Sequence, residues 1–389
     1  MEQTSTIGVI GAGAMGCGIA QVAATAGATV LLFDEDKKAV DKAKLNLGSG
    51  LKKLEEKGKI SKEASKEILS RIHFSTGLSE FESCTLVIEA IIENLAIKQK
   101  VFFEVEKIVH KNCILASNTS SLSIASIASS CKDPSRVIGI HFFNPAPIMP
   151  LVEIIPSLST KPGLADSCLT LLKSWGKTAV LAKDMPGFIV NRVARSYYGE
   201  SIRIYEEGIA DFATIDWAMK KFGGFRMGPF ELMDLIGNDV NYKVTESVWE
   251  QFFYEQRFKP SVTQKRLYES KLFGRKTGKG YYDYSEGAEM PRPNENEALG
   301  KNIFDRVITM LINEAIDSVY LGLGTKEDID LAMTKGVNYP KGLIRWGDEI
   351  GLENVLVTMN DLYTVYQEDR YRPSVLLKKM VKEKKKFYE

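Results

Sequence analysis

A glycine pattern near the start of the chain constrains its fold more than any other feature. Residues 7–16 read IGVIGAGAMG, so an apolar strand runs straight into the pattern Gly11-x-Gly13-x-x-Gly16, and a helix follows at once. In this setting the first glycine allows a tight turn, the second lets the backbone approach a diphosphate, and the third lets the helix pack closely on the strand. The pattern predicts a βαβ unit that binds a dinucleotide; a glycine turn without a ligand and another nucleotide such as FAD are the alternatives.

An acidic residue after the second expected strand indicates which dinucleotide is bound. Asp34 follows Gly11 by 23 positions, where a carboxylate accepts hydrogen bonds from the adenosine ribose hydroxyls and repels a 2′-phosphate. Glu35 and Asp36 add to this repulsion, so the pattern favours NAD over NADP. The expected cofactor contacts in this region are Gly11, Gly13, Ala14, Met15, Gly16 and Asp34.

Apolar strands alternate with helical stretches over the first half of the chain. The expected strands are Thr6–Ile10, Thr29–Phe33, Leu86–Ala90, Ile114–Ser117, Val137–His141, Leu151–Ile155 and Thr178–Leu181. The expected helices that follow the first two strands are Ala14–Ala26, Lys37–Lys57 and Ser61–Leu69. This alternation is typical of a doubly wound, Rossmann-type α/β domain with a parallel sheet. Because Pro186 and Gly187 break the chain, we expect the domain to span residues 1–185.

The second half of the chain is helical and contains an internal repeat. When the sequence is shifted by 114 residues, 14 of the 46 positions in 192–237 are identical to those in 306–351, without a gap. A repeat of this kind predicts two tandem copies of one all-α domain. We expect the copies to span 186–284 and 300–389, joined by a polar linker, 285–299, that carries two prolines.

Charge and composition exclude several classes of function. The chain has 51 basic and 50 acidic residues and a formal net charge of +1, which is no basic excess for nucleic acid or a membrane surface. No run of about 18 apolar residues occurs, and we expect no signal or transit peptide before the first strand. The cysteines and the three histidines show no metal-ligand spacing. We therefore expect a cytoplasmic protein with no metal, no nucleic-acid partner and no membrane contact.

Two segments carry candidate catalytic residues. In the segment GIHFFNPAPIMPLVEIIP, His141 ends one expected strand and Glu153 lies within the next. A carboxylate on one imidazole nitrogen raises the basicity of the other, as a base that removes a proton from an alcohol requires; a purely structural pair is the alternative. The segment 117–123, SNTSSLS, follows a strand. Its hydroxyl and amide groups either bind a substrate hydroxyl or cap the next helix.

Six motifs in order carry a resemblance to a known family. They read GAGAMGCGIA, IEAIIENLAIKQKVF, SNTSSLSI, HFFNPAPIMPLVEII, KDMPGFIVNR and MGPFELMDLIG. Over about residues 5–284 the chain closely resembles the L-3-hydroxyacyl-CoA dehydrogenases, and the repeat extends the resemblance to about residue 355. The duplicated helical domain resembles the dehydrogenase part of multifunctional β-oxidation enzymes. The resemblance implies an NAD-dependent enzyme that oxidises the 3-hydroxyl of an acyl-CoA, with a short chain such as 3-hydroxybutyryl-CoA expected.

The resemblance also implies roles for the residues at matching positions. His141 would be the general base and Glu153 its partner. Ser120 would bind the substrate hydroxyl and lie near the nicotinamide, and Asn191 would help hold the substrate carbonyl region and the catalytic histidine. The other implied contacts are, to NAD, Glu93, Lys98, Asn118, Ser120 and Lys276 and, to CoA, Lys57.

The second helical copy departs from the first, which bears on its role. MGPFELMD in the first copy becomes KGLIRWGD in the second, and Asn191 maps to Asp305. Since two subunits of single-copy relatives pair through this domain, the resemblance implies that the second copy replaces a partner subunit, so a monomer is expected rather than a homodimer. Two alternative functions stay open: an NAD-dependent dehydrogenase of a free hydroxy acid, and a catalytically silent NAD-binding protein.

Overall fold

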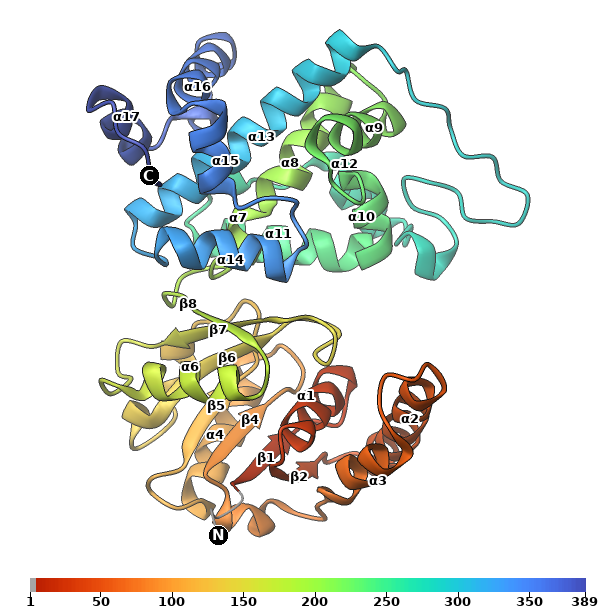
Figure 1. Cartoon of the computed structure of the whole chain (residues 1–389), viewed down its shortest axis with the longest axis vertical. Helices are drawn as coiled ribbons and strands as arrows, with labels where there is room; N and C mark the ends of the chain where they lie inside the picture. The colour runs from red at the N-terminus through yellow and green to blue at the C-terminus, as the bar shows by residue number, and fades with distance from the viewer. Residues whose placement is uncertain (1–4) are drawn as a thin grey trace. The chain divides into compact units, whose positions relative to one another are not determined.

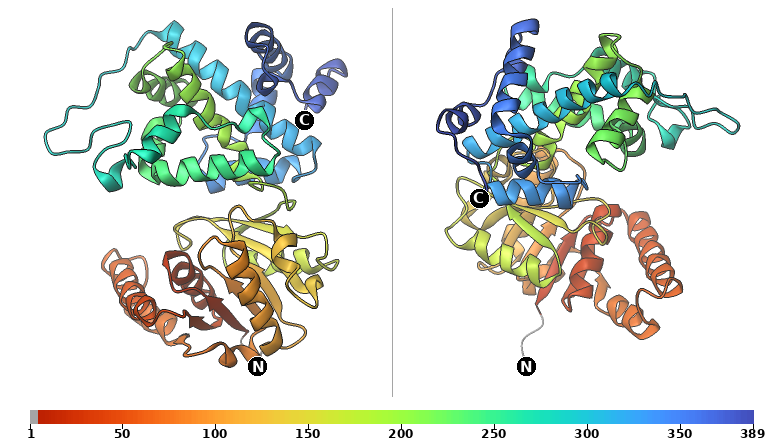
Figure 2. Two further views of the ribbon diagram at one scale, coloured as in Figure 1. Left: turned by 180° about the vertical axis from the view of Figure 1, so that it is seen from behind. Right: turned by 45° about the horizontal axis from the view of Figure 1, so that its top comes forward.

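The computed structural model describes residues 5–389, which divide into two compact units between Met185 and Pro186 (Figure 1). The first unit is built on a β-sheet, and the named elements of the second unit are all helices (Figure 2). Each unit is described by itself. None of the helices in residues 5–389 is long and apolar enough to cross a lipid bilayer.

In residues 5–185 of the first unit, eight strands form one sheet, in the order β3-β2-β1-β4-β5-β6-β7-β8. The first six strands of this order are parallel, whereas β7 is antiparallel to β6 and β8 is parallel to β7. The expectation of an all-parallel sheet is therefore wrong at β7, because the short connection from β6 cannot hold a crossover helix. The strands are β1 (Thr6–Ile10), β2 (Thr29–Phe33), β3 (Ile72–Phe74), β4 (Leu86–Glu89), β5 (Ile114–Ser117), β6 (Val137–Phe142), β7 (Leu151–Pro156) and β8 (Thr178–Leu181).

All seven expected strands are present, and three of them end one residue away from the predicted position. Strand β4 stops at Glu89, while β6 reaches Phe142 and β7 reaches Pro156. Strand β3 was not expected, since a three-residue strand carries too little periodicity to detect. Strands β4 and β6 are buried along their whole length, as expected for strands covered on both faces.

Helices cover both faces of the sheet, which makes the first unit doubly wound. Figures 1 and 2 show α1 and α6 on one face and α4 on the other. Helices α1, α2 and α3 agree with the three predicted helical stretches to within one residue at each end. The helices of this unit are α1 (Ala14–Thr25), α2 (Lys37–Glu56), α3 (Lys62–Ser70), α4 (Leu95–Ile108), α5 (Ile124–Ala128) and α6 (Leu164–Ser174).

The helical unit repeats one series of elements. Helices α9 to α12 recur in the same order as α14 to α17, and the long helix α13 takes the place of α7 and α8. Helix α13 begins at Glu297, so the last three residues of the expected linker are helical. The helices are α7 (Val190–Val193), α8 (Arg195–Glu206), α9 (Phe212–Gly223), α10 (Pro229–Ile236), α11 (Asn238–Gln251), α12 (Val262–Glu269), α13 (Glu297–Tyr320), α14 (Lys326–Gly336), α15 (Leu343–Ile350), α16 (Leu352–Tyr366) and α17 (Val375–Lys382).

Equivalent carboxylates make equivalent bonds in the two copies. Asp216 accepts hydrogen bonds from the first-turn N–H groups of α10 and from the Tyr282 hydroxyl, at 2.7 Å. Asp330 does the same for α15 and for the Tyr388 hydroxyl, at 3.0 Å. The repeated contacts therefore extend to Tyr388, which lies within the expected second copy, 300–389, and beyond the segment of sequence identity at 306–351. Both copies lie in one compact unit, so the division into separate domains at 186–284 and 300–389 stays a prediction.

Candidate active site

The glycine turn after β1 has the geometry that a dinucleotide site requires. Gly11 has φ +107°, and a Cβ there would lie 2.5 Å from the carbonyl oxygen of Ala90. A Cβ at Gly16 would lie 1.7 Å from the carbonyl oxygen of Gly11, so both positions exclude other residues on packing grounds. A Cβ at Gly13 would meet nothing within 4 Å. The fold itself therefore does not need glycine at position 13. The absence of a side chain there is instead what close approach of a diphosphate to the backbone requires.

The start of α1 and the end of β2 complete this turn. Gly13 and Ala14 are exposed, Met15 is half-buried, and the N-terminus of α1 has no side-chain cap. First-turn N–H groups without a cap attract an anion such as a diphosphate. The carboxylate of Asp34 accepts hydrogen bonds from the N–H groups of Ala12 at 2.7 Å and of Asp36 at 2.9 Å. Asp34 is thereby held directly beside the glycine turn.

The predicted site residues of the first unit gather at one edge of the sheet. The glycine turn follows β1, Asp34 follows β2, Glu93 follows β4 and Ser120 follows β5. His141 is the second-to-last residue of β6. These five strands are neighbours and parallel, so their carboxyl ends share an edge. From β1 the chain adds β2 and β3 on one side of the sheet and then crosses over to add β4 on the other side of β1. Ligands of doubly wound sheets bind at such a switch point.

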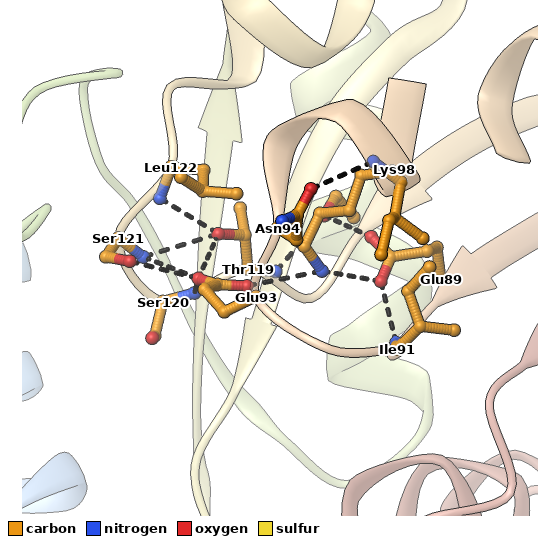
Figure 3. Close-up of polar contacts among 11 residues, drawn as sticks. Glu89, Ile91, Glu93, Asn94, Lys98, Thr119, Ser120, Ser121 and Leu122 are labelled. Atoms are coloured by element: carbon orange, nitrogen blue, oxygen red, sulfur yellow. Dashed lines mark hydrogen bonds and ion pairs between the residues drawn. The ribbon is translucent and has the colours of Figure 1, made fainter. Parts of the chain in front are cut away.

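A buried network of charges lies behind the β4 and β5 ends of this edge (Figure 3). The Lys98 ammonium is only 1% exposed and lies 2.6 Å from Glu89 and 3.2 Å from Glu93. Glu89 also accepts hydrogen bonds from the Ile91 N–H at 2.7 Å and the Ser117 hydroxyl at 2.6 Å. The network ties α4 to the ends of two strands. The ammonium of Lys98 is therefore placed to hold Glu93, and its role as a direct NAD contact stays a prediction.

Glu93 holds the loop after β5. Its carboxylate accepts hydrogen bonds from the Thr119 hydroxyl at 2.5 Å, from the Ser120 N–H at 3.0 Å, and from both the N–H and the hydroxyl of Ser121. Burial acts to raise the pKa of Glu93, but the charge of Lys98 and these hydrogen bonds lower it below its usual value. In Figure 3 the Ser120 hydroxyl points away from this carboxylate. Glu93 thus orders the loop while the Ser120 hydroxyl faces another direction.

His141 and Glu153 form the pair that the sequence indicated. They occupy paired positions of the antiparallel strands β6 and β7, and Nδ1 of His141 lies 2.7 Å from Oε2 of Glu153. Both side chains are buried. The Phe143 ring lies against the imidazole, with the ring centroids 4.5 Å apart. A carboxylate at Nδ1 selects the tautomer in which Nε2 is free of hydrogen and can accept a proton, which is the arrangement of a general base.

Asn118 connects the β5 loop to the strand that carries His141. Its Oδ1 atom accepts a hydrogen bond from the Phe142 N–H at 2.8 Å, and its own N–H donates to the carbonyl oxygen of Glu89 at 2.8 Å. Hydrogen bonds through Asn118 therefore connect the carboxyl ends of β4, β5 and β6. The side chain of Asn118 hydrogen-bonds to the backbone of β6, and its contact with NAD stays a prediction.

The remaining predicted residues lie on other elements. Lys57 is exposed at the C-terminal end of α2. Asn191 lies on α7 and Lys276 on a short 3₁₀ helix, 275–277, both in the helical unit. Lys276 pairs with Asp239, with its Nζ 2.6 Å from Oδ2. Their predicted contacts with CoA, substrate and NAD stay predictions.

Sequence analysis did not identify two acidic residues that have structural roles in this region. Glu89 ends the otherwise apolar strand β4, and a lone acid at a buried strand end was the available signal. Asp184 lies just before the break between the units and accepts hydrogen bonds from the Ile124 N–H at 3.0 Å and the Ala125 N–H at 2.8 Å. It thereby caps α5, and nothing local in the sequence marks that contact.

Comparison with known proteins identifies the family. The NAD binding domain of 3-hydroxyacyl-CoA dehydrogenase matches residues 6–185, and the C-terminal domain of the same enzymes matches residues 187–284 and 303–387. The 3-hydroxyadipyl-CoA dehydrogenase of Escherichia coli K12 is 35% identical, over 97% of this chain and 98% of its own. The mitochondrial hydroxyacyl-coenzyme A dehydrogenase of Sus scrofa is 42% identical, over 71% of this chain and 90% of its own.

The similarity extends to solved structures. The crystal structure of 3-hydroxybutyryl-CoA dehydrogenase from Escherichia coli K12 superposes with a TM-score of 0.91 at 34% identity, covering 98% of this chain and 99% of that one. The family match spans the glycine turn, the His141–Glu153 pair and both helical copies. This chain is therefore an NAD-dependent enzyme of the 3-hydroxyacyl-CoA dehydrogenase family.

Proposed function

We propose that the protein interconverts (S)-3-hydroxyacyl-CoA and 3-oxoacyl-CoA thioesters of short chain length by hydride transfer with NAD. The observation that supports this most is the buried His141–Glu153 pair at the same sheet edge as the glycine turn. Oxidation of an alcohol needs a base for the hydroxyl proton and a hydride acceptor close by. The paired imidazole supplies the base at the same sheet edge as the turn that is expected to hold the hydride acceptor.

Each residue then has a stated task. Because Nδ1 of His141 faces Glu153, Nε2 is the atom that takes the proton from the substrate hydroxyl, and Glu153 stabilises the imidazolium that results. Ser120 and Asn191 orient the substrate at its hydroxyl and its carbonyl region. Bound NAD supplies the hydride acceptor at its nicotinamide ring. In the reverse direction the same imidazolium returns the proton to the 3-oxo group.

The short acyl chain is proposed from the relatives. One is named for 3-hydroxyadipyl-CoA and a second for 3-hydroxybutyryl-CoA, and both of these acyl groups are short. Lys57, which is exposed at the end of α2, is proposed to contact a phosphate of CoA. We also propose that the enzyme works in the cytoplasm, where its five buried cysteines remain thiols.

The direct test is NADH oxidation with acetoacetyl-CoA, run beside NADPH and beside His141→Ala. We expect rapid turnover with NADH, weak turnover with NADPH and at least a roughly 100-fold loss of kcat in the variant. Tight NADH binding without turnover of any 3-oxoacyl-CoA would reject the proposal. It would then favour a free hydroxy-acid substrate or a silent NAD-binding protein.

We further propose that the enzyme is a monomer whose two helical copies act as an internal dimer. Arg192 Nε lies 2.5 Å from Glu314 of the second copy, and Arg306 Nε lies 2.6 Å from Glu200 of the first. A shift of 114 residues converts one pair into the other. Such a reciprocal exchange is the rule at a two-fold interface between identical subunits. The second copy therefore covers the surface that a partner subunit would otherwise cover.

A further inference from the structure

Arg195, the first residue of α8, differs from the other buried arginines of the described chain. Its side chain and backbone together are 7% exposed. A buried guanidinium normally pairs with a carboxylate, because burial of an unpaired charge costs free energy. The other buried arginines follow this rule, as the pairs Arg136–Glu106, Arg192–Glu314, Arg306–Glu200 and Arg370–Glu368 show.

The contacts of Arg195 are all with neutral groups. Its Nε donates to the carbonyl oxygen of Asn191 at 2.9 Å, and its Nη1 donates to the carbonyl oxygen of Asn241 at 3.3 Å and to the Thr245 hydroxyl at 3.0 Å. The guanidinium also lies over the Tyr198 ring, 4.9 Å from its centroid. Nη2 takes part in none of these hydrogen bonds. Within residues 5–389, no carboxylate pairs with Arg195.

A buried donor without a partner lies on Asn241, a residue that contacts Arg195. The Nδ2 atom of Asn241 is buried and makes no hydrogen bond among the described residues. The Oδ1 atom of the same side chain already accepts a hydrogen bond from Gln264 at 2.8 Å, so the amide orientation is set. In this part of the helical unit the Arg195 guanidinium therefore lacks a carboxylate, and the Asn241 amide lacks a hydrogen-bond acceptor. An acceptor that carries negative charge would satisfy both.

The internal repeat shows that the scaffold does not require an arginine here. The position equivalent to Arg195 in the second copy, 114 residues later, is Thr309. Thr309 is also buried, at 4% exposure, and is uncharged. The same helix position therefore tolerates a small neutral side chain. The cation occurs in the copy that carries Asn191, whereas the second copy has Asp305 in place of that asparagine.

We propose that Arg195 binds a carboxylate at the far end of the acyl chain, so that the enzyme accepts short dicarboxylic acyl-CoA thioesters. This inference rests on the proposed function, in which Asn191 holds the substrate carbonyl region. Arg195 follows Asn191 by one helical turn, about 5.4 Å of rise, and a few methylene groups cover that distance. The diphosphate of NAD and the phosphate of CoA are assigned to the sheet unit, at the glycine turn and at Lys57. The remaining anion of such a substrate is its terminal carboxylate.

The test compares two six-carbon substrates that differ at the chain end, 3-oxoadipyl-CoA and 3-oxohexanoyl-CoA, each with NADH. We expect the wild-type enzyme to have the higher kcat/KM for 3-oxoadipyl-CoA. Arg195→Met should lower kcat/KM for that substrate by about 10- to 100-fold, the value of hydrogen bonds to a charged group, mainly through KM. The same variant should change kcat/KM for 3-oxohexanoyl-CoA by less than about threefold. Arg372→Met, which removes an arginine that is 56% exposed, should leave both values unchanged.

Two outcomes would overturn the inference while the proposed function stands. One is an equal loss on both substrates in Arg195→Met, which would mean that Arg195 only holds the backbone of Asn191. The other needs no variant: a wild-type enzyme with no preference for 3-oxoadipyl-CoA over its terminal methyl ester. Absence of turnover with every 3-oxoacyl-CoA, including acetoacetyl-CoA, would instead reject the proposed function and this inference with it.

Discussion

Nδ1 of His141 and Oε2 of Glu153 lie 2.7 Å apart across paired positions of two antiparallel strands. The strand pairing fixes the separation, so an amide in place of the carboxylate keeps the shape of the site and removes only the charge. Glu153→Gln should therefore lower kcat by at least about 100-fold with little change in KM, because the imidazolium loses its stabilising charge. The measurement is steady-state reduction of acetoacetyl-CoA by NADH. The exposed Glu104→Gln is the control, and a loss below about threefold in Glu153→Gln would contradict the assigned role.

Asp34 should determine the choice between NAD and NADP. Its carboxylate lies beside the glycine turn, where a carboxylate is expected to repel a 2′-phosphate and to accept hydrogen bonds from the ribose of NAD. Asp34→Ser should raise KM for NADH and improve the NADPH to NADH ratio of kcat/KM by at least about tenfold, the value of one charged contact. Asp41→Ser, at an exposed position on α2, should leave the ratio unchanged. An unchanged ratio in Asp34→Ser would place the selectivity elsewhere.

The buried Lys98 should contribute strongly to stability. Its removal leaves Glu89 and Glu93 without their shared cation, at 1% and 36% side-chain exposure. Breaking a buried pair in this way costs about 3 kcal/mol or more, whereas an exposed pair contributes about 0.5 kcal/mol. Lys98→Met should therefore lower the free energy of unfolding in urea much more than Lys107→Met, which breaks an exposed pair with Glu104. Equal effects of the two variants would show that the network is not important for folding.

Local signals explain which parts of the site were predictable from the sequence. The glycine turn, Asp34 and the strand that ends near His141 each depend on residues close together in the chain. The pairing of His141 with Glu153 was also indicated, since adjacent strands carry the two residues. Sequence periodicity carries no information on strand direction, and the antiparallel β7 was not predicted, although the short connection 143–150 was a signal of it. Strand β3 was not predicted either, because three residues are too few to show an alternating pattern.

Contacts between distant segments explain what sequence reasoning missed. Glu89 lies inside the expected strand Leu86–Ala90, and the resemblance implied Lys98 as an NAD contact. The pairing of these two residues depends on the fold. The unpaired charge of Arg195 also becomes visible only when every neighbour is known. The hydrogen bond from the Tyr388 hydroxyl to Asp330 shows that the repeat includes the end of the second copy. The sequence did not show this, because the segment around Tyr388 that matches Tyr282 is too short to recognise in a lysine-rich tail.

The reciprocal Arg192–Glu314 and Arg306–Glu200 pairs predict that the enzyme is monomeric. If the second copy covers the pairing surface as proposed, sedimentation equilibrium should give the chain mass of 43.4 kDa across the concentration range. Arg192→Met should lower the free energy of unfolding by about 3 kcal/mol without changing that mass. Arg266→Met, at 73% side-chain exposure, is the matched control. A stable species of twice the chain mass at low concentration would refute the internal-dimer interpretation.

Titration of Asp216 should make stability depend on pH. Burial raises the pKa of Asp216 to about 7, against hydrogen bonds from Tyr282 and the start of α10 that lower it. Because the folded-state value lies above the usual 3.8, the folded protein binds this proton more tightly than the unfolded chain does. The stabilising contribution of the protonated carboxyl is therefore complete below pH 4 and is lost as the pH rises through 7.

Replacing that carboxyl isolates its contribution. The free energy of unfolding of the wild-type protein minus that of Asp216→Asn should fall between pH 5 and pH 8, as measured by urea denaturation. Asp283→Asn is the control, because hydrogen bonds from Ser285 lower the pKa of Asp283 to about 2, so its difference from the wild type should stay constant over this range. Parallel pH profiles for the wild type and Asp216→Asn would show that the carboxylate is already charged at pH 5. In that case its hydrogen bonds to Tyr282 and the first turn of α10 outweigh the cost of burial.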